Sequence, residues 1–398
     1  MAILYVFAVI TVLLGIVSLL QGIQSARYMR SRTAGAVYDR AQSLKVTVFC
    51  PCKGVDPEFE ENIRSILDQD YPGYRVHFIV ESQEDPACDA LRQLGVTKIL
   101  VAGQAKDRGQ KVHNLAYGVG YGGRDCDVLV FCDSDARYPP DWLSNLVPPL
   151  AGDAAVGAAT GYRWYVPRPL TFPNLLRSAW NAVAVSALGN PRRCFAWGGS
   201  LAIRRETFER IGVLQGWQGS VSDDYAITRA VQAAGLKIVF VPRCLIPSYG
   251  NCGWADLAEF TTRQMIITRV YYNGLWRAAL VSYSIFNVTF IGLTAAALTD
   301  TVAAAFWMAI YGLTVARSWL RYDSVKSVLS PGALSSGWFY ILCAPLVSML
   351  YLYNVIRSGL TTDIVWRGIH YKLVSPRETR VTTPCARPPA KTEHERSG

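Results

Sequence analysis

The chain has 398 residues, enough for one large domain or two smaller ones, and 51% of them are hydrophobic. Its formal net charge of +10 fits a nucleic acid, an anionic membrane surface or a phosphate-bearing ligand as partner. No basic run with interleaved aromatic residues is typical of a nucleic-acid module, so we expect membrane and phosphate partners and no nucleic acid. The ten cysteines are scattered, which predicts reduced, mostly buried thiols rather than a zinc site or a disulfide framework.

The first apolar segment, residues 3–23, contains no charge and is long enough to cross the hydrocarbon core of a bilayer. No basic segment precedes it and no small-residue cleavage pattern follows it. Residues 1–26 are therefore predicted to be a transmembrane helix rather than a signal peptide. Arg27, Arg30 and Arg32 follow at once, and basic residues beside a span favour the cytoplasmic side, so the next domain is expected in the cytosol.

The middle of the chain, residues 45–275, alternates between short apolar runs and amphipathic segments. This alternation predicts an α/β domain with a mostly parallel, Rossmann-like sheet, whose ligands bind beyond the carboxyl ends of the strands. A helix is predicted over 56–70, with Asp56 as its cap and Pro57 in its first turn. Strands are predicted at 45–51, 74–82, 127–135 and 237–242.

Two acids, Asp133 and Asp135, follow directly after the apolar run that ends at Cys132. Carboxylates so close together repel each other, and one interpretation is a solvated loop in which one of them caps the next helix. The other interpretation is a pair of oxygen ligands for Mg²⁺ or Mn²⁺, with the cation holding a diphosphate. Glu81, Glu84 and Asp85 lie at the carboxyl end of the second predicted strand and are expected at the same edge of the sheet.

The chain becomes apolar again towards its C-terminus. The segments 278–298 and 301–320 are each long enough to cross a bilayer, and 337–356 is a third candidate that a proline interrupts. We therefore assign residues 278–356 to membrane segments. Three full crossings would leave the basic stretch 366–372 outside, against the usual charge distribution, so we expect 337–356 to be re-entrant or interfacial.

Two flanking stretches complete the division of the chain. The segment 260–277 combines aromatic residues with Arg263 and Arg269, which predicts an interfacial helix between the α/β domain and the membrane. Residues 357–398 are expected to form a basic tail. From Pro376 onward this tail is rich in Pro, Thr, Lys and Arg, which predicts disorder.

Several short motifs occur in order along the chain: "KGVDP" at 53–57, "DYPGY" at 70–74, "EDPA" at 84–87, "KVHN" at 111–114, "DSD" at 133–135 and "DDY" at 223–225. With these motifs the chain resembles the ceramide glucosyltransferase family and its bacterial lipid-glycosyltransferase relatives, which are inverting GT-A enzymes. The resemblance covers roughly residues 45–375. It implies a GT-A fold and a membrane-bound enzyme that moves one glucose-type sugar from a UDP-sugar to a lipid hydroxyl, such as that of ceramide.

The resemblance also implies roles for individual residues. Asp133 and Asp135 would hold Mg²⁺ or Mn²⁺ on the donor's diphosphate, and Asp224 would be the general base for the acceptor hydroxyl. Lys111 and Asn114 would lie near the nucleotide or its phosphates. The other residues placed around the donor or the acceptor are Lys53, Glu81, Asp85, Asp133, Gly199, Ser200, Asp223, Arg263 and Gln264.

Two positions depart from the family pattern. Ser82 stands where the family's first acid is expected, and Glu81, Glu84 or Asp85 would replace it in contact with the uracil or ribose. The family's R/Q-x-x-R-W signature is reduced here to Arg263 or Gln264 as its first residue. Two other functions stay open: a processive polysaccharide synthase of the same superfamily, and a non-catalytic membrane scaffold with a degenerate transferase fold. In each case we expect an integral protein of a bacterial inner membrane or a Golgi- or ER-type membrane.

Overall fold

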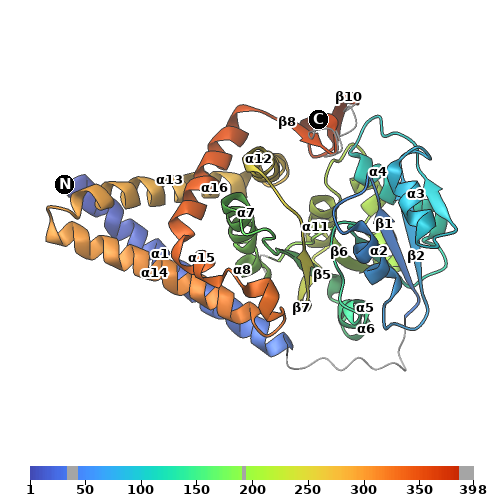
Figure 1. The fold of residues 1–398 in the computed structure, drawn as a ribbon, viewed down its shortest axis with the longest axis horizontal. Coiled ribbons are helices and arrows are strands. Elements are labelled where there is room, and N and C mark those ends of the chain that lie inside the picture. The colour runs from blue at the N-terminus through green and yellow to red at the C-terminus, as the bar shows by residue number, and fades with distance from the viewer. Residues whose placement is uncertain (34–43, 191–193, 385–398) are drawn as a thin grey trace, which may run out of the picture.

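A seven-stranded sheet forms the centre of the α/β domain (Figure 1). The computed structural model describes residues 1–33, 44–190 and 194–384. The strands lie in the order β3-β2-β1-β4-β6-β5-β7, and every strand except β6 runs parallel to its companions, which confirms the mostly parallel sheet. They are β1 (Val46–Pro51), β2 (Tyr74–Val80), β3 (Ile99–Val101), β4 (Val128–Cys132), β5 (Val156–Tyr165), β6 (Ser200–Arg204) and β7 (Lys237–Ser248).

Strand β4 shows why the sheet is buried on both faces. Its sequence is apolar at every position, and successive side chains of a strand point to opposite faces. Leu129 and Phe131 therefore enter one hydrophobic core, while Val128 and Val130 enter the other. The helices of the α/β domain are α2 (Phe59–Leu67), α3 (Pro86–Gln93), α4 (Gln110–Gly122), α5 (Trp142–Leu146), α6 (Pro148–Gly152), α7 (Phe172–Ala182), α8 (Val185–Leu188), α9 (Arg205–Arg210), α10 (Val213–Gly216), α11 (Asp223–Ala233) and α12 (Trp254–Tyr271).

The first helix of the domain starts later than the sequence predicts. Helix α2 begins at Phe59, and the residue before it, Glu58, has a left-handed backbone with φ 61° and makes no side-chain cap. The carboxylate of Asp56 is not a cap because it binds the guanidinium of Arg367 at 2.5 and 2.8 Å. The expectation that Asp56 caps a helix over 56–70 is therefore wrong, because a partner 311 residues away takes its side chain.

Four long helices form a second body beside the α/β domain (Figure 1). Two of them, α1 (Ala2–Thr33) and α13 (Asn273–Ala296), are long and apolar enough to cross a membrane. The third, α14 (Thr301–Val325), packs along α1, but it is not among the helices that are apolar enough by themselves. The Tyr5 hydroxyl donates a hydrogen bond of 2.5 Å to Asp300 Oδ2 at one end of this group, and Arg30 binds Asp323 at 2.7 Å at the other.

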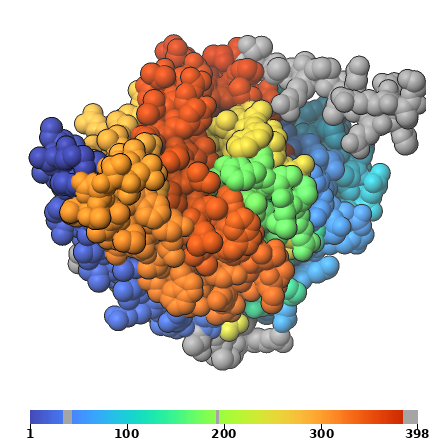
Figure 2. All heavy atoms as spheres, turned by 60° about the vertical axis from the view of Figure 1, so that its left-hand side comes forward, coloured from blue at the N-terminus to red at the C-terminus, as the bar shows by residue number. Residues whose placement is uncertain are grey.

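The fourth long helix follows a sharp bend. The short helices η2 (Pro331–Leu334) and α15 (Gly337–Leu342) meet α16 (Ala344–Leu360) at an angle of 82°, which is the geometry of a broken span or a re-entrant loop. The proline expected to interrupt this segment lies in the first turn of α16, where its missing N–H is tolerated. Figure 2 shows the C-terminal helices packed beside the segments of α7 and α12 on one face of the molecule.

The C-terminal part of the chain returns to the α/β domain. Strands β8 (Asp363–Trp366), β9 (Ile369–Ser375) and β10 (Glu378–Pro384) form a small antiparallel sheet. Ile364, Tyr371 and Leu373 pack with α12 residues in a buried cluster, so the tail has a hydrophobic face that holds it in place. The expected disorder from Pro376 onward is therefore wrong up to Pro384, and residues 385–398 lie outside the described residues.

Candidate active site

A cavity of about 1130 Å³ lies at the carboxyl ends of the parallel strands and extends to the long apolar helices. Helix α12 and the turn between β8 and β9 also line it. Its α/β end includes Lys53, Lys111, Asp133, Asp135, Arg163, Asp223 and Asp224. Its opposite end is built by α1, α7, α8, α13, α14 and α16, with Gln21, Trp180, Tyr283, Arg317 and Tyr351 in its wall.

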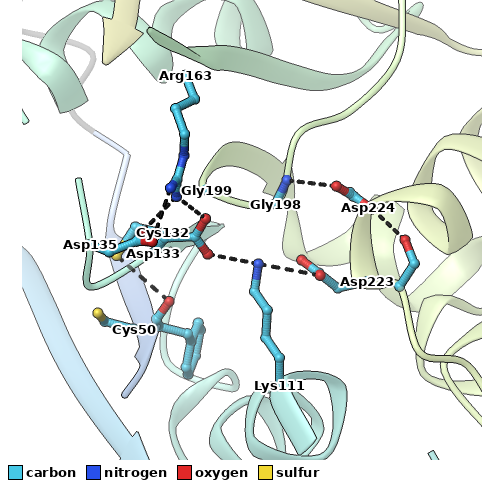
Figure 3. A network of polar contacts seen from close by, with 12 residues as sticks. Cys50, Lys111, Cys132, Asp133, Asp135, Arg163, Gly198, Gly199, Asp223 and Asp224 are labelled. Atoms are coloured by element: carbon cyan, nitrogen blue, oxygen red, sulfur yellow. Dashed lines mark hydrogen bonds and ion pairs between the residues drawn. The ribbon is translucent and has the colours of Figure 1, made fainter. Parts of the chain in front are cut away.

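Asp133 and Asp135 share one arginine (Figure 3). Arg163 Nη2 lies 2.8 Å from Asp133 Oδ2 and 2.5 Å from Asp135 Oδ1, and Arg163 Nη1 lies 2.9 Å from Asp135 Oδ2. Burial alone would raise the pKa of Asp135, but the charges of Arg163 and Arg367 hold that pKa well below its usual range. The solvated-loop interpretation is therefore wrong, because both carboxylates take part in a partly buried ion-pair network.

Lys111 connects the first pair of acids to the second. It lies in the first turn of α4, and its Nζ is 2.7 Å from Asp133 Oδ1 and 3.3 Å from Asp223 Oδ1. Burial alone would lower the pKa of this amine, but Asp133, Asp223 and Asp224 together raise it above its ordinary value. The ammonium group is therefore charged at neutral pH, and it is held where several carboxylates face one another.

Asp223 and Asp224 start α11, after the N-cap Ser222, but they lie in different environments. The Asp223 side chain is only 3% exposed, and its Oδ2 has no hydrogen-bond partner among the described residues. Burial raises the pKa of Asp223 to about 6, opposed by Lys111 and assisted by repulsion from Asp224. Asp224 Oδ1 accepts hydrogen bonds from Ser222 Oγ and from Tyr225 N at 2.7 Å, whereas Oδ2 meets only Gly198 N at 3.5 Å.

The glycine pair before β6 lets the backbone approach these acids. A Cβ at Gly198 would lie 2.0 Å from Asp223 Oδ2, and one at Gly199 would lie 2.5 Å from Asp133 Oδ2. Both glycines thus leave room for the protein's own carboxylates. Ser200, in contrast, is fully buried, and its hydroxyl accepts a hydrogen bond from Trp142 Nε1 at 2.8 Å. The expected ligand contact at Ser200 is therefore wrong, because its side chain belongs to the core beneath the site.

The residues after β1 and β2 hold each other in place. Lys53 pairs with Glu81, and the Gly54 amide donates a hydrogen bond of 2.8 Å to Asp85 Oδ1. Asp85 also caps α3, and of these acids only Asp85 lines the cavity. Asn114 is buried on α4 and donates to Ile79 O at 3.4 Å. The structure thus brings Lys53, Asp85 and Asn114 to one end of the cavity and leaves Glu81 behind Lys53.

Arg263 and Gln264 reach the cavity from α12. Arg263 Nη1 donates to Val365 O at 2.9 Å and contacts Glu259 at 3.2 Å, so it ties α12 to β8. Arg269 faces away from the acids and donates to Ser358 O at 2.6 Å. Of the cations expected on 260–277, Arg263 is thus the one that lines the cavity, and Arg269 holds the end of α16.

The sequence alone does not reveal two cationic residues of this site. Arg163 lies inside β5, where all ten residues are buried, and no motif marks it. Arg367 has a left-handed backbone with φ 51° at the β8–β9 turn, and its guanidinium lies 3.7 Å from Asp135 while it binds Asp56. Arg367 adds a positive charge to the site. Burial raises the pKa of Asp56 above its ordinary value, although the charge of Arg367 opposes this shift. Both arginines come from segments far from the acids in sequence.

Comparison with known proteins identifies the family. The model of glycosyl transferase family 21 matches residues 4–379, which is nearly the whole chain. The chain belongs to this family. Family 21 is the ceramide glucosyltransferase family, so the resemblance seen in the sequence motifs and the assignment as a glycosyltransferase are confirmed.

Two known proteins are similar to parts or to the fold of this family 21 glycosyltransferase. A ceramide glucosyltransferase of Komagataella phaffii is 31% identical over 125 residues, which are 29% of this chain and 24% of that protein. The chain thus matches about a quarter of the length of this curated relative. The solved mannosyltransferase PcManGT of Pyrobaculum calidifontis, in complex with GDP-Man and Mn²⁺, has a TM-score of 0.50 at 17% identity. That match covers 90% of this chain and 98% of PcManGT, which shows the GT-A fold.

The acids of this glycosyltransferase fit a divalent cation. Asp133 and Asp135 offer hard oxygen donors, and Asp223, which Lys111 links to Asp133, has a buried Oδ2 without a hydrogen-bond partner among the described residues. Those residues contain no ready cluster of three or more metal-ligating side chains, so water and donor oxygens would complete the coordination, as is usual for Mg²⁺. The network contains five carboxylates and three cationic side chains, so two negative charges are in excess, which one divalent cation would balance. The carboxylates are those of Asp56, Asp133, Asp135, Asp223 and Asp224, and the cations are Lys111, Arg163 and Arg367.

We predict that the variant Arg163→Gln gains more stability from Mn²⁺ than the wild type does. A cation that binds Asp133 and Asp135 must displace the Arg163 guanidinium, and the variant removes this competitor. Each tenfold gain in affinity corresponds to about 1.4 kcal/mol of added stability at saturating metal. Thermal unfolding in detergent, with and without Mn²⁺, measures the difference.

The matched control is Arg204→Gln. Arg204 is another partly buried arginine, but it donates only to the backbone oxygens of Leu150, Asp153 and Val156, away from the cavity. This variant should lose stability and keep the wild-type response to Mn²⁺. An equal Mn²⁺ response in wild type and Arg163→Gln would contradict metal binding by the two aspartates.

Proposed function

We propose that the protein transfers one glucose-type sugar from a UDP-sugar to a hydroxyl of a membrane lipid such as ceramide, with inversion at the anomeric carbon. The observation that carries the proposal is the single cavity that joins the carboxylate network to the apolar helices α1, α13, α14 and α16. A nucleotide-sugar is water-soluble, whereas a lipid acceptor stays in the membrane. A cavity with one end in each environment can admit both substrates to the same acids.

The donor is proposed to lie at the end of the cavity next to β1 and α4. Lys53, Asp85 and Asn114 line this end and offer charged and polar groups to a nucleotide. Asp133 and Asp135 are the proposed ligands of Mg²⁺ or Mn²⁺, which would neutralise the diphosphate as it leaves. Lys111, Arg163 and Arg367 are the cations within reach of that diphosphate, and arginine suits phosphate oxygens through paired hydrogen bonds.

Asp224 is the proposed general base because one of its oxygens is open to the cavity. Its Oδ1 is held by Tyr225 N and Ser222, whereas Oδ2 has only one long contact, with Gly198 N at 3.5 Å. Asp223 is a poorer choice because its side chain is 3% exposed and faces Gly198 and Lys111. Asp224 Oδ2 would take the proton of the acceptor hydroxyl as the oxygen attacks the anomeric carbon. A single displacement of this kind inverts the configuration.

The acceptor is proposed to reach Asp224 along an aromatic wall. Tyr351 stacks on Trp180 with ring centroids 4.7 Å apart and on Tyr283 with centroids 4.8 Å apart. These rings come from α16, α7 and α13, and all three line the cavity. Aromatic side chains suit the boundary between lipid and water because they combine apolar area with a polar group. Phe260 and Gln264 of α12 complete the wall beside the acids.

Asp224→Asn should lower turnover by about 10²–10⁴-fold, the usual contribution of a positioned base, with donor affinity little changed. Asp223→Asn is the matched comparison, because it removes a neighbouring carboxylate that the cavity exposes less. Steady-state kinetics, with UDP-sugar binding measured by calorimetry, separate the two effects. Loss of donor binding with normal turnover per bound donor would make Asp224 a binding residue and would transfer the base assignment to Asp223.

The substrate assignment predicts a glycolipid product. Cells with the gene should contain a lipid that carries one added hexose, and cells with Asp133→Ala in its place should lack it. The measurement is mass spectrometry of total lipid extracts, followed by assays of a panel of lipid acceptors in nanodiscs. If a soluble sugar is extended as well as any lipid, or if the product carries many sugars, the polysaccharide synthase alternative replaces the lipid acceptor.

The α/β domain is proposed to face the cytosol, where nucleotide sugars are made. Arg27, Arg30 and Arg32 lie at the end of α1 that joins this domain, in agreement with the positive-inside tendency. Protease protection in sealed vesicles should place residues 50–270 on the cytosolic side. Cleavage from the opposite side only would overturn both this orientation and the cytosolic donor.

A further inference from the structure

Arg317 of α14 lines the end of the cavity away from the acids, and Arg321 lies one helical turn further along the same helix, where it contacts Ser186, another residue of the cavity wall. The Cγ of Arg317 lies 3.7 Å from the point that a Cβ would occupy at Gly22, so Arg317 packs closely against α1. Arg321 donates one hydrogen bond of 2.9 Å, from Nε to Ser186 Oγ of α8. Both side chains are partly enclosed between the apolar helices and the α/β domain.

Neither guanidinium has a carboxylate partner among the described residues. Arg30, by comparison, reaches the same helix and pairs with Asp323 at 2.7 Å. Arg317 has neither a hydrogen bond nor an ion pair to any described residue, and its charge repels that of Arg321. Two partly buried cations that repel each other are costly unless an anion joins them. Because Arg317 lies in the cavity wall, an anionic ligand that enters the cavity can supply this missing negative charge.

The depth of these residues matches that of lipid headgroups. Arg317 follows Thr301, the start of α14, by 16 residues, which corresponds to about 24 Å along a helix. The hydrocarbon core of a bilayer is about 30 Å thick, so Arg317 lies near its boundary on the side of the α/β domain. The bond from Arg321 to Ser186 of α8 places the pair at the contact between the two bodies. Ser18 and Asn190 line the same end of the cavity and make it polar.

We propose that this end of the cavity binds the phosphate of a lipid headgroup, with Arg317 as its main contact and Arg321 as the second. Arginine suits this ligand because its planar group donates two parallel hydrogen bonds to phosphate oxygens. The phosphate has two possible sources: a phospholipid of the bilayer, or an acceptor lipid that itself carries a phosphate, which ceramide does not. The proposal rests on the proposed function in treating α1, α13 and α14 as membrane-embedded, and its test uses the proposed donor site as a check of folding, whereas the phosphate site does not depend on which sugar is moved.

The test compares lipid retention by two double variants. One is Arg317→Gln with Arg321→Gln, and the control is Arg277→Gln with Arg357→Gln, which changes exposed arginines of α13 and α16 that do not line the cavity. Each protein is placed in nanodiscs of phosphatidylglycerol and phosphatidylcholine, released, and examined by native mass spectrometry. Wild type and control should retain phosphatidylglycerol, and the first variant should lose it by about tenfold or more for each arginine.

The fold of each variant is checked by UDP binding, which uses the distant end of the cavity. Equal retention of phosphatidylglycerol in all three proteins with UDP binding intact would overturn the proposal, whether or not the enzyme transfers sugar to a lipid. If the first variant loses UDP binding, Arg317→Lys with Arg321→Lys replaces it, and these lysines should restore part of the retention. If the double lysine variant binds UDP but retains no more phosphatidylglycerol than the double glutamine variant, the proposal is overturned.

Activity distinguishes the two sources of phosphate. If the phosphate belongs to the acceptor, the first variant raises the acceptor KM and phosphatidylglycerol in the bilayer has no effect. If a bilayer phospholipid supplies the phosphate, wild type needs phosphatidylglycerol for full activity, and the first variant does not respond to it. Both results support a phosphate site at Arg317, and they assign its natural ligand.

Discussion

The site depends on one electrostatic constraint, the need to hold five carboxylates in a small volume that water reaches poorly. Arg163 offsets the repulsion between Asp133 and Asp135 by pairing with both of them. Lys111 does the same between Asp133 and Asp223. Each cation comes from a rigid element, Arg163 from β5 and Lys111 from the first turn of α4. The acids thus keep fixed positions before a substrate arrives, and fixed positions are what metal and diphosphate binding requires.

The cationic side chains of this network do not fully offset the negative charge of its carboxylates. Asp223 keeps one buried oxygen without a hydrogen-bond partner among the described residues, and burial raises its pKa to about 6 because the charge of Lys111 offsets only part of that effect. A carboxylate with a raised pKa is more costly to ionise in the folded protein than in the unfolded chain. Its contribution to stability is therefore largest at low pH and decreases as pH rises towards 6. The free energy needed to ionise Asp223 is thus spent at the cavity, where a bound cation could offset it.

The sequence predicts the acids of the site better than the cations. Asp133 and Asp135 follow an apolar strand and are visible as a local pattern, and the order of the motifs is sufficient to predict the GT-A fold. Arg163 is hidden because an arginine inside a buried strand has no local signature. Arg367 is hidden because its partner Asp56 is 311 residues away, and only the folded chain brings them together. For the same reason the sequence misplaces Ser200, whose hydroxyl is taken by Trp142, and the tail after Pro376, whose partners are on α12.

The connections between the two bodies determine how the acids stand relative to the membrane helices. The chain leaves the α/β domain through α12 and returns through β8, and Arg263 joins these two segments by its bond to Val365 O at 2.9 Å. Helix α13, which follows α12, is also joined to α16, which precedes β8. Trp276 Nε1 of α13 donates a hydrogen bond of 2.9 Å to Ser358 Oγ of α16. Both connections lie beside the cavity. The body of long helices is therefore fixed to the α/β domain beside the cavity, and a rigid joint there would hold Asp224, the proposed base, at one depth relative to the proposed lipid acceptor.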